Sequence, residues 1–93
     1  MAKVKAKVSV KPSAGVSVLS ISIDGDDVPL VAKKGTVSLE SPDRYIVIWQ
    51  FSGAPGETLG IEVEAAGKTV FEIKKSRIPA NEFAAAGIGR FDI

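Results

Sequence analysis

The run Tyr45–Phe51, which reads Tyr-Ile-Val-Ile-Trp-Gln-Phe, constrains the fold more than any other segment of this chain. Successive side chains of an extended strand point to opposite sides. One side of this strand is large and partly aromatic and is expected to lie in a core: Tyr45, Val47, Trp49 and Phe51. The other side carries Ile46 and Ile48 and is also mostly apolar, although one face of an antiparallel strand commonly meets water. The run therefore predicts an all-β protein and raises the question of what covers these two isoleucines.

Alternation of apolar and polar residues with period two recurs along most of the chain. It predicts strands over these segments: Ala2–Lys11, Val16–Ile23, Thr36–Glu40, Tyr45–Phe51, Thr58–Ala65, Thr69–Lys74 and Ile88–Ile93. The parity slips between Val18 and Leu19, which indicates a β-bulge. The segment Val28–Val31 is expected to be edge-like, because Pro29 cannot donate to a ladder. About seven strands with turn signals roughly every ten residues are typical of an antiparallel β-sandwich.

The strand number, the length of 93 residues and Trp49 in the central run resemble immunoglobulin-like sandwiches. The resemblance implies a single β-sandwich domain over residues 1–93, a length that suits one domain. The sequence has no cysteine, so the disulfide pair of antibody domains is missing. The resemblance therefore implies a shape and carries no functional residue to this chain.

The composition excludes several kinds of catalytic site. The chain has neither histidine nor cysteine, so Ser-His-Asp triads, Cys-His pairs and thiolate or imidazole metal sites cannot form. We expect no enzyme, no catalytic residue, no cofactor and no metal ligand. The net charge is +1, and no apolar stretch approaches the roughly 20 residues of a membrane span. We therefore expect a small soluble protein that binds no membrane. It is cytoplasmic as written, with export by a trimmed signal peptide left open.

Two charged features are candidate binding sites. The turn Asp24–Asp27 holds the densest group of carboxylates, which calcium could use, but an Asp-Gly hairpin turn explains the same residues. Lys3, Lys5 and Lys7 form a cationic row. No aromatic residue is interleaved with them to stack on bases, so we expect no nucleic-acid partner. The row is expected to protect a sheet edge from aggregation.

The function predicted from these patterns is that of a non-enzymatic interaction module, acting through contact with another protein or through weak homodimerisation. Ile46 and Ile48 are the candidate interaction patch. The alternative is a calcium-dependent, carbohydrate-binding or small-ligand-binding domain that uses the Asp24–Asp27 turn. Three covers for the patch are considered: the segment Ile78–Ile88 folded over the sheet, a second copy of the chain, or a different partner on an open face. The internal cover is the one we expect.

Overall fold

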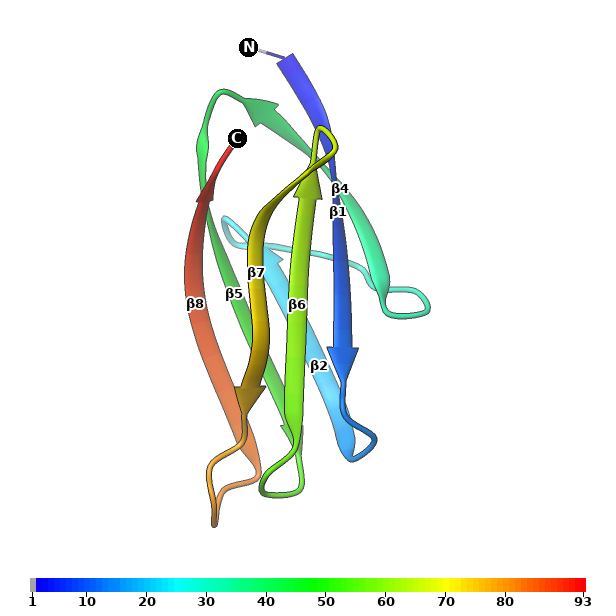
Figure 1. Cartoon of the computed structure of the whole chain (residues 1–93), viewed down its shortest axis with the longest axis vertical. Helices are drawn as coiled ribbons and strands as arrows, with labels where there is room; N and C mark the ends of the chain where they lie inside the picture. Colours follow the sequence, from blue (N-terminus) through cyan, green and yellow to red (C-terminus); the bar gives the residue numbers. More distant parts are fainter. Residues whose placement is uncertain (1) are drawn as a thin grey trace.

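Two antiparallel sheets pack against each other in the computed structural model, which describes residues 2–93 (Figure 1). Sheet A has the strand order β4-β1-β6-β7, and sheet B has the order β3-β2-β5-β8. The strands are β1 Ala2–Pro12, β2 Val16–Ile23, β3 Asp26–Asp27, β4 Lys34–Ser41, β5 Arg44–Gly53, β6 Thr58–Ala65, β7 Lys68–Arg77 and β8 Ala84–Asp92. The predicted all-β sandwich is confirmed, with eight strands because the turn after β2 leads into the two-residue β3. Its likeness to immunoglobulin-like domains concerns this two-sheet architecture.

The core lies between the sheets and uses the predicted face of β5. Side chains along β5 alternate strictly between exposed and buried from Arg44 to Phe51. The largest fully buried side chains come from both sheets and from the loop after β7: Val8, Ile21, Val47, Leu59, Val63 and Ile78. Trp49 is 5% exposed, so its predicted place in the core is confirmed.

The segment Ile78–Ile88, which was expected to cover the outside of β5, instead contributes to a strand beside it. Ala84–Asp92 forms β8, which continues sheet B beside β5 with Ile88 directly opposite Ile48. Ile46 and Ile48 stay 41% and 39% exposed, and Phe83 is 70% exposed. The prediction of an internal cover is therefore wrong. The small residues Ala84–Gly87 fit an edge strand because the neighbouring strand β5 supplies the hydrogen bonds.

The row Lys3, Lys5 and Lys7 lies on β1, which pairs with β4 along residues 2–9 and with β6 only along residues 6–12. Lys7 therefore has a strand on both sides, and the prediction of edge protection is wrong for it. Lys3 and Lys5 have β4 on one side and no paired strand on the other. Their spacing marks the solvent face of a strand, and an interior strand of an antiparallel sheet has such a face just as an edge strand does.

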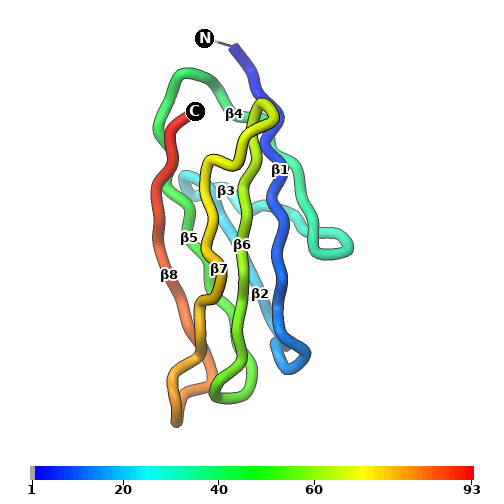
Figure 2. Tube along the Cα trace, in the orientation of Figure 1, coloured from blue at the N-terminus to red at the C-terminus, as the bar shows by residue number. Residues whose placement is uncertain are grey.

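The bulge predicted in β2 is confirmed within one residue. The register between β2 and β5 shifts between Val16 and Val18, which moves the remainder of the strand onto the parity that buries Ile21 and Ile23. The expected edge-like strand at Val28–Val31 is reduced to a single bridge between Val31 and Lys34. β7 and β8, the last strands of the two sheets, lie along the same side of the sandwich (Figure 2).

Candidate functional site: the outer face of sheet B

The solvent side of sheet B, here called the outer face of sheet B, is unusually apolar for an exposed surface. The ladder registers align its side chains in rows across β2, β5 and β8. These rows are Ser22–Ile48–Ile88, Ser20–Gln50–Ala86 and Val18–Ser52–Ala84, with Ile46–Arg90 and Arg44–Asp92 following across β5 and β8. The charged side chains of β5 and β8 on this face are thus confined to one end of the sheet.

Three isoleucines form an apolar patch on this face, here called the isoleucine patch. Ile46 is 41% exposed, Ile48 is 39% exposed and Ile88 is 68% exposed. Ile48 and Ile88 are direct cross-strand partners, so their side chains are neighbours on one surface. Single exposed apolar residues are ordinary, whereas a contiguous group on one face commonly marks an interaction site.

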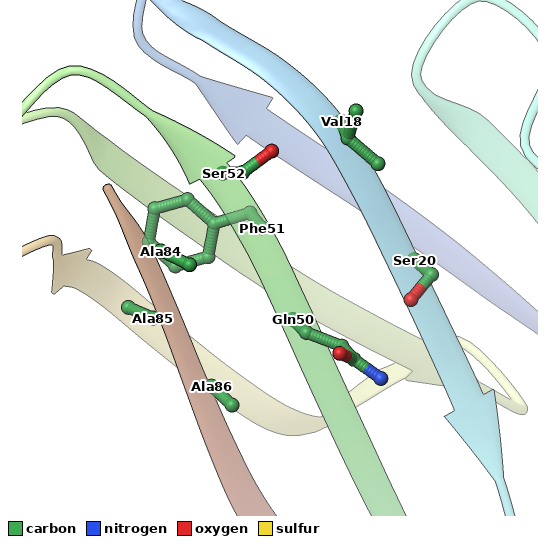
Figure 3. Close-up of a pocket in the computed structure, with 8 residues that line it drawn as sticks. All are labelled: Val18, Ser20, Gln50, Phe51, Ser52, Ala84, Ala85 and Ala86. Carbon is green, nitrogen blue, oxygen red and sulfur yellow. The ribbon is translucent and has the colours of Figure 1, made fainter. Parts of the chain in front are cut away.

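A shallow hollow lies on the two rows of side chains next to the row of Ile48 and Ile88. Figure 3 shows the residues that line it. Its volume is about 360 Å³. It is lined by Val18, Ser20, Gln50, Phe51, Ser52, Ala84, Ala85 and Ala86. The hollow forms because alanine and serine flank the longer Gln50 side chain on both neighbouring strands. The Gln50 amide offers two donors and an acceptor at the edge of an otherwise small, uncharged surface.

The outer face of sheet A has the opposite character. Lys3 of β1 is directly opposite Glu40 of β4, and Lys7 of β1 is directly opposite Glu64 of β6. Positive and negative side chains thus alternate across the strands. This mixture leaves no purely basic surface for a polyanion, and it makes sheet A the hydrated side of the sandwich.

In the Asp24–Asp27 turn, the carboxylate of Asp24 has a structural role, because it accepts a backbone hydrogen bond. Asp24 and Gly25 have φ of 50° and 86°, the left-handed region that favours Asn, Asp and Gly in tight hairpins. Asp24 Oδ1 accepts a hydrogen bond from Ile46 N at 2.8 Å, and Asp24 N donates to Ile46 O at 2.8 Å. Within residues 2–93, acidic side chains nowhere gather in the threes or more that could hold a metal ion.

The aromatic rings of β5 and β8 lie inside the sandwich. Tyr45 is 7% exposed, and its ring stacks on Phe91 with centroids 5.6 Å apart. The Tyr45 hydroxyl accepts a hydrogen bond from Glu40 N at 2.7 Å and donates one to Glu40 O at 3.0 Å. Its hydrogen-bonding groups are thus used in joining β5 to β4.

The alternation along β5 predicted two of the three isoleucines of the patch. Ile46 and Ile48 lie where expected, on the outer face, while Ile88 and the hollow beside it were missed. One signal for Ile88 was present in the sequence. In a strand that begins at Ala84, Ile88 lies on the face opposite to Gly87 and Gly89, which is the outer face.

Comparisons with protein-family models, curated proteins and solved structures find no match to this chain. In the part of the chain that the structure describes, there is no helix with the length and hydropathy needed to cross a membrane.

Proposed function

We propose that this chain is a non-enzymatic interaction module that binds protein through the outer face of sheet B. The observation that carries the proposal is the isoleucine patch, Ile46, Ile48 and Ile88, exposed side by side on β5 and β8. The contrast between the two outer faces supports it, because the same chain places charged side chains across sheet A.

The size of the patch indicates what kind of partner it suits. Full burial of one isoleucine is worth about 1.5–3 kcal/mol. Given exposures of 41%, 39% and 68%, covering all three contributes about 2–4 kcal/mol. This is less than the cost of association for two proteins. A partner must therefore add contacts beyond the patch, and the hollow around Gln50 and the exposed strand β8 are the adjoining surfaces.

Photo-crosslinking in the cells that make the protein tests this proposal. A photoreactive amino acid is placed at position 48, and at position 5 in a matched control on the outer face of sheet A. We expect discrete protein adducts from position 48 and none from position 5, and the adduct masses distinguish a second copy from a different protein. Adducts from both positions, or from neither, would overturn the proposal.

A further inference from the structure

The free edge of β8 can be located atom by atom from the hydrogen bonds that flank it. Asp43 and Ile93 exchange two backbone hydrogen bonds of 3.1 and 3.0 Å, and Gly53 N donates to Phe83 O at 3.0 Å. Both pairs lie in the same register as the β5–β8 ladder. Bonded and non-bonded pairs alternate along an antiparallel ladder, so the odd-numbered residues of β8 bond to β5. The even-numbered residues direct N–H and C=O away from β5: Ala84, Ala86, Ile88, Arg90 and Asp92.

No strand pairs with these outward groups, because sheet B ends at β8. The five even-numbered residues that carry them are all exposed. Ile46 on β5 supports the assignment, because its N–H and C=O bond to Asp24 beyond the end of β2. The backbone N–H and C=O groups of β5 therefore point toward β2 at even-numbered residues and toward β8 at odd-numbered residues.

β8 lacks the usual protection of a sheet edge. Natural edges are commonly blunted by lysine, proline, bulges or short length. β8 is nine residues long, contains no lysine or proline and runs beside β5 without a register shift. Its charged residues are Arg90 and Asp92, and Asp92 Oδ1 is paired with Arg44 Nε at 2.9 Å. β7, the edge of sheet A on the same side, carries Lys68, Lys74, Lys75 and Arg77.

We infer that a second copy of this chain adds to β8 as an antiparallel strand, with Ile88 of each copy opposite Ile88 of the other. This inference rests on the proposed function and names the partner. Ile88 is the middle residue of the nine-residue strand. A two-fold axis there sets Ala86 opposite Arg90 and Ala84 opposite Asp92, so every outward N–H and C=O of β8 is used. Like charges are never opposite each other in this register.

The position of Ile88 favours a second copy as the partner. A two-fold axis perpendicular to the sheet keeps both outer faces on the same side. The row Ile48–Ile88 of one copy then continues into the row Ile88–Ile48 of the other. The two Ile88 side chains are direct cross-strand neighbours at the axis, an apolar contact that the second copy supplies by symmetry. The charged outer faces of sheet A remain in water.

Ala86→Pro tests the pairing directly. The Ala86 N–H points to the free edge, so proline removes no bond to β5, and strands tolerate proline where the N–H faces solvent. Ala86→Thr is the matched control, because it also enlarges the side chain but keeps the N–H. Sedimentation velocity from micromolar to millimolar concentration should show a monomer–dimer equilibrium for the wild type and for Ala86→Thr. Ala86→Pro should weaken the dimer at least about ten-fold.

Two further measurements keep the inference testable if Ala86→Pro fails to fold. Ile88→Lys leaves every backbone group in place, yet sets two ammonium groups against each other at the two-fold axis, and should also give a monomer. In the wild type, hydrogen exchange at Ala86 and Ile88 should slow as protein concentration rises. A wild-type monomer at every concentration, or a dimer in which these amides exchange freely, would overturn strand addition. Adducts of other proteins at position 48 on such a monomer would leave the proposed function intact.

Discussion

The indole ring of Trp49 lies over Gly87, its direct partner on β8. A Cβ atom at Gly87 would overlap the indole ring, so the single tryptophan of the chain fits only because its neighbour has no side chain. Gly89 gives the same room to the ring of Phe71. Glycine usually weakens a strand, and here two glycines allow the aromatic side of the core to close.

Gly87→Ala should therefore destabilise the protein although alanine is the better strand residue. The overlap with the indole forces Trp49 or β8 to move, and overpacking of this kind costs about 1–3 kcal/mol. Chemical denaturation measures the effect. Ala86→Ser, an outward change on the same strand, should stay within about 0.5 kcal/mol of wild type. Equal stability of Gly87→Ala and wild type would show that the ring is not held against the backbone.

Trp49 should report the native core by fluorescence. Its emission should be blue-shifted and weakly quenched by iodide, and should move to the red on unfolding, because the side chain is 5% exposed. Trp49→Ala should cost about 3–5 kcal/mol, as large core truncations do. A native emission maximum typical of indole in water would contradict this placement.

Glu57 should hold one end of the sandwich together. Its Oε2 accepts hydrogen bonds from Ser13 Oγ at 2.6 Å and Gly15 N at 3.1 Å, joining the β1–β2 turn to the start of β6. Hydrogen bonds to a charged acceptor are stronger than neutral ones, so Glu57→Ala should lose about 1–2 kcal/mol of stability. Glu64→Ala, on the exposed outer face of sheet A, is the control and should change little. A similar loss of stability in both variants would point to the change in net charge and not to the hydrogen bonds of Glu57.

Lys74 on β7 should resist aggregation, and Lys7 on β1 should not. Lys74→Thr and Lys7→Thr make the same change in net charge, but β7 is an edge strand, whereas Lys7 lies where β1 has β4 on one side and β6 on the other. The β7 variant should aggregate sooner because charged residues keep exposed edges from pairing. Light scattering during incubation near the unfolding temperature measures the lag time. Equal lag times for the two variants would show that edge position is irrelevant.

Asp24 should stabilise the β2–β3 turn and should not bind calcium. Asp24→Ala removes the acceptor for Ile46 N and places alanine at a φ of 50°, so it should cost about 1–2 kcal/mol. Asp26→Ala keeps both Asp24 bonds and serves as the control. Saturable NMR shifts confined to Asp24, Asp26 and Asp27 at sub-millimolar calcium would contradict this expectation.

Local periodicity was enough to predict β5, the faces of β1 and the bulge in β2, because each depends on residues adjacent in the chain. The place of β8 was not predicted. In Ala84–Gly87 all four side chains are small, so no contrast between an apolar and a polar face exists to show the period. The interior position of Lys7 was also missed, because a strand's neighbours are set by segments far along the chain, here Thr36 on β4 and Glu64 on β6.

The pairing of β1 also governs how fast this protein can fold. Ala6 is opposite Val37 on one side and Ala65 on the other, so the first strand forms a ladder with no segment near it in sequence. Closing such long loops costs chain entropy before any contact offsets it. Folding should therefore take milliseconds to seconds, as for other non-local β-topologies. In that interval the Tyr45–Phe51 segment has both of its apolar faces in water, which makes it an aggregation-prone part of the unfolded chain.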